Sequence, residues 1–194
     1  MLDFEATCDE PATYPHEIIE VPVVVVDLRT GERDQSRGFH RYVRPIEHPT
    51  LSAFCHSLTG IEQWQVAAAA DLPTVLGELV AWLRREELDT IGGSAVWMTC
   101  GAWDLHKALP KQCARQGIPV PPELSAAGFV NVKRAFAEHY AIRGRQAGMA
   151  EMLERAHLPL IGRHHCGLDD ARNIASVVSH LCARGVTEWV VERV

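Results

Sequence analysis

The chain has 194 residues, of which 47% are hydrophobic, and it carries a formal net charge of −6 at pH 7. This length and apolar content suffice for one buried core, so we expect a single domain over residues 1–194. An acidic chain is not expected to coat nucleic acid non-specifically, but carboxylates gathered around divalent cations are compatible with an enzyme that acts on nucleic acid.

The sequence shows no sign of a membrane segment or of a disulfide framework. No run approaches the roughly 18 apolar residues that a spanning helix needs, and the start does not resemble a secretion signal. The six cysteines have no regular spacing, which is typical of reduced thiols and not of disulfides or a zinc site. We therefore expect a cytoplasmic protein without a membrane partner.

The chain opens with a short predicted strand over residues 2–7. Strand side chains alternate between two faces, so Asp3 and Glu5 share one face and the apolar residues around them share the other. Taken alone, such a pair of acids is more often a solvated face than a site. Almost no residue precedes Asp3, and we expect this strand to be shorter than a central strand needs.

The elements predicted after it alternate as in an α/β protein. Runs of β-branched and apolar residues predict strands at 17–27, 38–43 and 94–100. Apolar residues at helical spacing predict helices at 61–70, 72–87, 103–117, 129–140, 146–157 and 168–183. Since the sequence contains neither an internal repeat nor a linker, these elements describe one α/β unit.

The last predicted helix places a carboxylate on its buried side. Asp170 lies four residues before Ile174 and shares its apolar face. A carboxylate directed at a core is costly unless the helix N-terminus or, more effectively, a bound cation compensates it. His165, five residues upstream, can arch over the same place. A capping Asp and a loop His would explain these two residues equally well.

Four acids fall at the ends of predicted elements, namely Asp3, Glu5, Asp104 and Asp170. Carboxylate oxygens of this kind suit Mg²⁺ or Mn²⁺. Two such ions stabilise the attacking and leaving oxygens of a phosphoryl displacement, and a neighbouring His can deprotonate the attacking water. The four acids together therefore indicate metal-dependent phosphoryl chemistry.

Three stretches resemble a known family: Asp3-Phe4-Glu5-Ala6-Thr7-Cys8, Trp103-Asp104 and His165-Cys166-Gly167-Leu168-Asp169-Asp170. They are similar to the three motifs of DEDDh-type 3′→5′ exonucleases and, more narrowly, to those of the Eri1-like branch. The resemblance extends over about residues 2–180. An isolated D-x-E is a weak signal, but three motifs in this order with H-x₄-D spacing are specific.

The resemblance implies an α/β, RNase H-like exonuclease fold with a five-stranded mixed β-sheet flanked by α-helices. It implies that Asp3, Glu5 and Asp170 hold one Mg²⁺ ion, and that Asp3 and Asp104 serve a second, with Mn²⁺ as a substitute. His165 would be the general base, and the products would be nucleoside 5′-monophosphates.

The resemblance also implies that Phe54 and Trp103 sandwich the terminal base, and that Ala6, Thr7 and Leu58 belong to the same substrate site. Stacking on aromatic faces suits this role because it contributes about 1–3 kcal/mol per base without sequence preference. Aromatic residues beside apolar runs are nevertheless more often core residues. The expected partner is the 3′ end of single-stranded nucleic acid, with RNA favoured over DNA.

Alternatives stay open at this point. The chain could act on single-stranded DNA, or it could be a catalytically silent nucleic-acid-binding module, which the acidic charge and the short first strand favour. A phosphatase that uses Asp3 as its nucleophile would want a second Asp where Glu5 stands. Cys100 stands where the resemblance leads us to expect an acidic residue, and we assign it no role.

Overall fold

The computed structural model describes residues 1–126 and 128–193. Within these ranges six strands form two three-stranded sheets. The first sheet is antiparallel with the order β1 (Glu5–Ala6), β2 (Ile18–Val26) and β3 (Arg33–Tyr42). The second pairs β4 (Trp97–Thr99) in parallel with β5 (Phe129–Asn131), and β5 in antiparallel with β6 (Val191–Glu192).

A seam at Leu2 joins the two sheets. Leu2 forms a bridge with Val23 of β2, and its N–H donates to the carbonyl of Met98 in β4 at 3.0 Å. The sheets therefore act as one mixed arrangement across the middle of the molecule. Asp3 and Glu5 follow this seam directly, so the first two acids of the predicted site stand at the centre of the fold.

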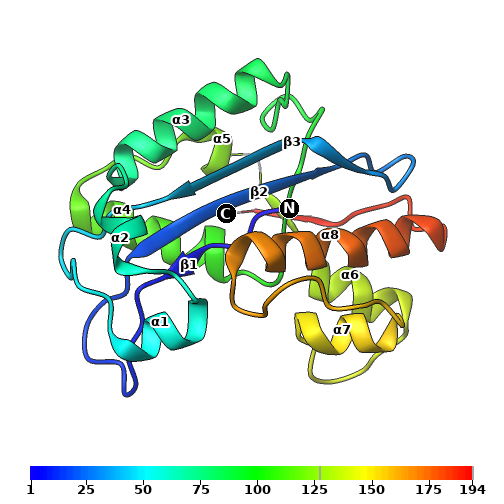
Figure 1. Cartoon of the computed structure of the whole chain (residues 1–194). Coiled ribbons are helices and arrows are strands. Elements are labelled where there is room, and N and C mark those ends of the chain that lie inside the picture. Colours follow the sequence, from blue (N-terminus) through cyan, green and yellow to red (C-terminus); the bar gives the residue numbers. More distant parts are fainter. Residues whose placement is uncertain (127, 194) are drawn as a thin grey trace.

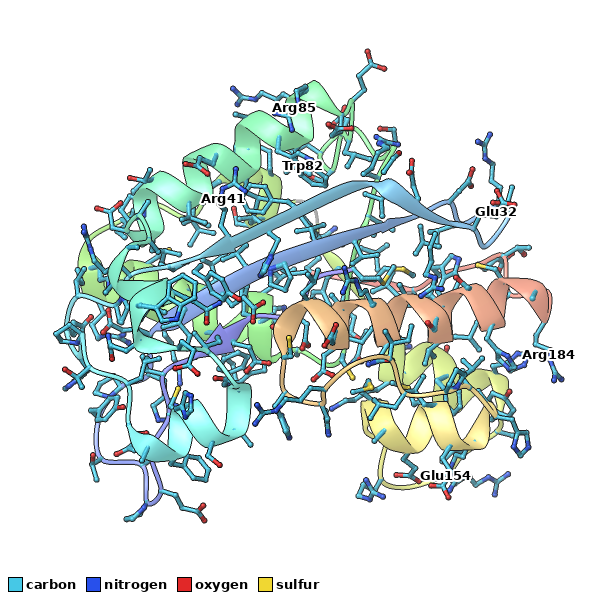
Figure 2. All side chains as sticks on the ribbon, viewed as in Figure 1. Glu32, Arg41, Trp82, Arg85, Glu154 and Arg184 are labelled. Atoms are coloured by element: carbon cyan, nitrogen blue, oxygen red, sulfur yellow. The ribbon has the colours of Figure 1, made fainter. Side chains whose placement is uncertain are left out.

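Helices α3 (Leu72–Arg85) and α8 (Gly167–Ala183) lie on opposite sides of the long strands β2 and β3 (Figure 1). Because side chains alternate along β2, Val23 joins the core cluster that contains α3, whereas Val24 packs against the cluster that contains α8. Trp82 of α3 points at the sheet, while Arg85 on the same helix points outward (Figure 2). Two apolar layers thus enclose the strands.

The other helices are short, and their bounds are α1 (Ala53–Thr59), α2 (Gln63–Ala67), the π-helical η1 (Asp104–Ala108), α4 (Leu109–Gln116), α5 (Pro122–Ser125), α6 (Val132–His139) and α7 (Met149–Arg155). None of the helices in the described ranges combines the length and the apolar character that crossing a membrane requires.

The structure differs from the expected elements in two places. Residues 129–131 form β5, so α6 begins only at Val132, where the side chain of Asn131 caps the helix by accepting the Lys133 N–H at 3.1 Å. The expected helix at 103–117 consists of η1 followed directly by α4, with Pro110 in the first turn of α4. Because proline has no N–H, it interrupts the hydrogen bonding of the helix at the point where η1 becomes α4. The six strands of the described residues thus form two three-stranded sheets joined at Leu2, where the resemblance implies one five-stranded mixed sheet.

Candidate active site

The first strand sorts its side chains as the alternation predicts. Leu2 and Phe4 are buried in the core cluster that contains α3, with 0% and 4% of their surface exposed. Asp3 and Glu5 therefore face the other side of the sheet, towards α8. Glu5 pairs in register with Glu20 of the neighbouring β2.

Helix α8 brings the third carboxylate to these two. One oxygen each of Asp3, Glu5 and Asp170 lies within 4.8 Å of the others. Asp170 is only 5% exposed, and its Oδ1 is buried without a hydrogen-bond partner. A buried carboxylate oxygen without a partner is costly, so this atom indicates that the cluster is built to receive a cation.

The electrostatics of the cluster support the same conclusion. Burial, and then the charges of Asp104 and Glu5, raise the pKa of Asp3 well above its ordinary value. Burial and the charges of neighbouring acids raise the pKa of Glu5 from 4.5 to about 9. Burial also raises the pKa of Asp170. A divalent cation would remove this repulsion, and three carboxylates are a suitable oxygen ligand set for Mg²⁺ or Mn²⁺.

Asp104 stands beside this group at the start of η1. Its Oδ1 accepts the N–H of Phe4 at 2.8 Å, which fixes the carboxylate next to the strand that carries Asp3. Burial raises the pKa of Asp104 to about 6, against the opposing effect of that backbone hydrogen bond. Asp104 is not part of the three-carboxylate group, and this position suits the predicted role at a second ion. A π-helical turn is frequent at functional sites.

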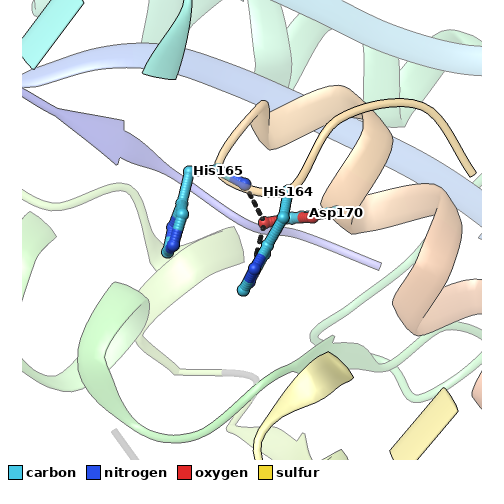
Figure 3. A group of neighbouring side chains, drawn as sticks. All are labelled: His164, His165 and Asp170. Atoms are coloured by element: carbon cyan, nitrogen blue, oxygen red, sulfur yellow. Dashed lines mark hydrogen bonds and ion pairs between the residues drawn. The ribbon is translucent and has the colours of Figure 1, made fainter. Parts of the chain in front are cut away.

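Two histidines project side by side from the loop before α8 (Figure 3). The rings of His164 and His165 are stacked, with centroids 3.9 Å apart. The backbone N–H of His165 donates to Asp170 Oδ2 at 2.9 Å, and Nε2 of His164 lies 3.9 Å from the same oxygen. Burial and then the charges of His164 and Arg163 lower the pKa of His165, which favours the neutral ring that a general base requires.

The His loop is held in a strained conformation. His165 has φ +66°, a left-handed value that is uncommon for a residue other than glycine. The Arg163 guanidinium donates to the carbonyls of Ser57 and Leu58 at the end of α1, and the Arg163 N–H donates to Asp169 Oδ2 at 3.0 Å. Asp169 thus acts as a local anchor of the loop.

Sequence reasoning missed a fifth acid, Glu20 of β2. Its side chain is 1% exposed, and its Oε2 accepts the N–H of Gly167 at 3.1 Å while Oε1 lies 2.7 Å from Nε2 of His40. A Cβ at Gly167 would lie 2.9 Å from both Asp3 O and Glu20 Oε2, so only glycine fits this contact. The signal in the sequence was a charged residue within an otherwise apolar strand.

The residues predicted to hold the terminal nucleotide surround β1 and η1. Phe54 on α1 is 38% exposed and Trp103 is 43% exposed, which leaves both rings available for stacking. Ala6 and Trp103 line a hollow of about 260 Å³, and Leu58 is half-buried at the end of α1. Thr7 is fully buried, and its N–H and hydroxyl are both bonded to Glu17. Its side chain therefore supports the Ala6 backbone and does not face the hollow.

A separate cavity of about 490 Å³ lies in front of the acids. It is lined by the three carboxylates and both histidines together with Cys100, Lys133, Arg145 and the start of α7. Burial raises the pKa of the Cys100 thiol to about 12. The thiol is thus protonated at neutral pH, and the structure gives it no evident role.

The comparisons with known proteins agree with this geometry. The family model described as Exonuclease matches residues 1–178. Human ERI1 exoribonuclease 3 is 39% identical over 185 residues, and human 3'-5' exoribonuclease 1 is 38% identical over 187 residues, each over 95% of this chain. The chain spans 53% and 52% of these two proteins, which is about half of their length.

Among solved structures, the nuclease domain of 3'hExo, a DEDDh family member bound to rAMP, has a TM-score of 0.90 and 36% sequence identity to this chain. That similarity covers 100% of this chain and 95% of the other. The α/β, RNase H-like exonuclease fold expected from the sequence is therefore confirmed.

Proposed function

This chain belongs to the exonuclease family, in its Eri1-like DEDDh branch, and we propose that it removes nucleotides from the 3′ ends of single-stranded RNA. The observation that carries the proposal is the group formed by Asp3, Glu5 and Asp170, in which Oδ1 of Asp170 is buried without a hydrogen-bond partner and beside which the rings of His164 and His165 lie. A cytoplasmic location and a single domain over the whole chain stay predictions.

The family implies divalent metal ions, and we propose Mg²⁺, with Asp3, Glu5 and Asp170 holding one ion and Asp3 and Asp104 serving another. When bound, such a pair stabilises the attacking and leaving oxygens of an in-line displacement at phosphorus. In the reaction water adds to the phosphorus, the P–O3′ bond breaks, and the remaining strand takes up a proton on its new 3′-hydroxyl. His165 accepts the proton of the attacking water.

RNA is the proposed substrate because the two human relatives bear the name exoribonuclease and the 3'hExo domain was solved with rAMP. Phe54 and Trp103 are proposed to stack on the terminal base, since both rings are exposed and Trp103 directly precedes Asp104. Such stacking does not depend on base identity, which suits an enzyme that removes successive nucleotides of any sequence. In this scheme the protein makes no base-specific contact with the strand that remains after cleavage.

The test is a gel time course on a 5′-labelled single-stranded RNA with Mg²⁺, beside a DNA of the same sequence. We expect a ladder that shortens from the 3′ end, is lost with EDTA, and forms faster on RNA. Asp3→Asn and Asp104→Asn should each abolish the ladder while leaving the thermal unfolding temperature near that of the wild type or above it.

Glu78→Gln is the control, because Glu78 lies on α3, on the other side of the sheet from α8, and pairs only with Arg41 among the described residues. This variant should keep activity within a few-fold. If the folded wild-type protein leaves the RNA intact and titration calorimetry finds no Mn²⁺ binding, the enzyme proposal fails and the silent binding module replaces it. A faster ladder on DNA would overturn the choice of RNA.

A further inference from the structure

The cavity in front of the acids has a second wall to which the proposed function assigns no role. The first wall consists of the carboxylates and the histidines. The second carries Lys133 on α6, Arg145 on the loop that follows it, and Gly148 and Met149 at the start of α7. These residues face a reaction centre with no other positively charged side chain among the described lining residues.

The terminal nucleotide occupies a different part of the surface in the proposed scheme. Trp103 and Ala6 share their hollow with Tyr14 and Lys107, and neither Lys133 nor Arg145 lines it. A linear strand passes the reaction centre once. If its last base rests against Trp103 and its scissile phosphate faces the carboxylates, the nucleotides on the 5′ side leave through the cavity that Lys133 lines.

The placement of Lys133 makes it suitable for a phosphate contact. A Cβ built at Gly101, whose φ is +108°, would lie 3.6 Å from the Lys133 ammonium, so the side chain runs along the end of β4. Its charge lowers the pKa of both Asp104 and Cys100, which places the ammonium within the field of the acid group. In the described part of the chain it has no ion-pair partner within 4.0 Å.

Arg145 differs from Lys133 in its environment. Its side chain is 78% exposed and pairs with Glu151 at 2.7 Å. A Cβ at Gly148, which lines the same cavity, would meet no atom within 4 Å, so the cavity is open at this residue. A strand leaving the acids meets the unpaired Lys133 first and the paired Arg145 at the rim. Ammonium and guanidinium groups are the usual protein partners of backbone phosphates.

We propose that Lys133, assisted by Arg145 at the rim, binds the phosphate on the 5′ side of the scissile bond and so holds the strand that remains after each cleavage. The inference rests on the proposed exonuclease function and adds the direction in which the strand lies. Lys133 is then a substrate-binding residue for the retained strand. It has no part in binding the nucleotide that is released.

The test compares two substrates in the full chain with Mg²⁺. One is a single-stranded oligoribonucleotide, and the other is the p-nitrophenyl ester of uridine 5′-monophosphate, in which p-nitrophenol replaces the whole 5′ strand. Lys133→Met should raise KM for the oligonucleotide about 10-fold. It should also reduce the slope of log kcat/KM against log salt by about 0.7, the value for one phosphate contact on a single strand. Hydrolysis of the ester should stay within twofold of the wild type.

Two further variants control for charge and for the helix. Lys133→Arg should restore KM for the oligonucleotide to within threefold. Arg134→Met alters the next residue of α6, whose side chain pairs with Glu138 and Glu192, and it should leave both substrates unaffected. Thermal unfolding of each variant shows that α6 is intact.

Each other result overturns the inference. An unchanged KM and salt slope in Lys133→Met would show that the strand takes another path. An equal loss on both substrates would assign Lys133 to the reaction centre. Wild-type protein inactive on both substrates would instead refute the proposed function itself, so the two failures are distinguishable.

Discussion

Replacing Glu5 by Gln is expected to abolish activity and yet stabilise the metal-free protein. The pKa of Glu5 is raised from 4.5 to about 9, first by burial and then by the charges of Glu20, Asp170 and Asp104. The folded state therefore retains a proton that the unfolded state releases. Because of this difference, the free energy of unfolding falls as the pH rises from about 4.5 to about 9.

The stability that Glu5 costs the protein at pH 7 depends only on how far this pH lies above 4.5, the ordinary pKa of the group. Glu5 is still largely protonated in the folded protein at that pH, while it is ionised in the unfolded chain. Each pH unit above 4.5 costs about 1.4 kcal/mol, so the loss at pH 7 is about 3 kcal/mol. Gln resembles the protonated acid and avoids this loss. For a chain of this size the gain corresponds to a Tm about 6–12 °C higher, whereas at pH 5 it should be under about 1 kcal/mol.

The assay is differential scanning calorimetry of both proteins in EDTA at pH 5, 7 and 8.5, repeated with Mn²⁺. The wild type should gain stability with Mn²⁺ and the variant should gain little. Glu17→Gln is the control, because that buried carboxylate accepts three backbone N–H groups from residues 46–48 and loses acceptors on substitution. It should be less stable at every pH. A Glu5→Gln protein with an unchanged or lower Tm at pH 7 would refute the reasoning.

Three further substitutions test the rest of the site. His165→Ala should lower kcat about 10²–10⁴-fold in a gel assay, with the affinity for Mn²⁺ retained. A larger loss of kcat in His164→Ala would show that His164, and not His165, is the general base. Gly167→Ala places a Cβ 2.9 Å from Asp3 O, so we expect the free energy of unfolding in denaturant titration to fall by about 1–3 kcal/mol. The stabilisation by Mn²⁺ should also be smaller than in the wild type. Wild-type stability in this variant would contradict the close contact. Trp103→Ala should raise KM roughly 10-fold or more in steady-state kinetics, and an unchanged KM would remove the ring from the substrate site.

The sequence allowed the fold class and the local placement of three carboxylates to be predicted. Alternation along residues 2–7 places Asp3 and Glu5 on one face, and helical spacing places Asp170 on the buried side of α8. Both patterns are local, and the structure has the three carboxylates together. Asp104 could be located because it begins the helical element that follows a buried strand.

Long-range partners could not be read from local patterns. Phe129 and Val130 precede a helical pattern that predicts them to be helical, but they pair in parallel with Trp97 and Met98 of β4. The local sequence around residue 129 does not indicate that these residues pair with β4. Glu20 was missed for the same reason, because its meaning lies in the contact with Gly167, which is distant in the sequence.

The seam at Leu2 has a consequence for how the protein reaches its active form. Leu2 connects β2 with β4, two strands that lie far apart in the chain, and contacts of this kind are slow to form because a long loop must close first. The acids Asp3 and Glu5 adjoin this late contact on its carboxyl side. The contact between α8 and β2 closes a still longer loop, since the N–H of Gly167 donates to Glu20. Asp3, Glu5 and Asp170 therefore come together only when both contacts have formed. Competence to bind an ion therefore reports on completed assembly of the whole domain and not on either half.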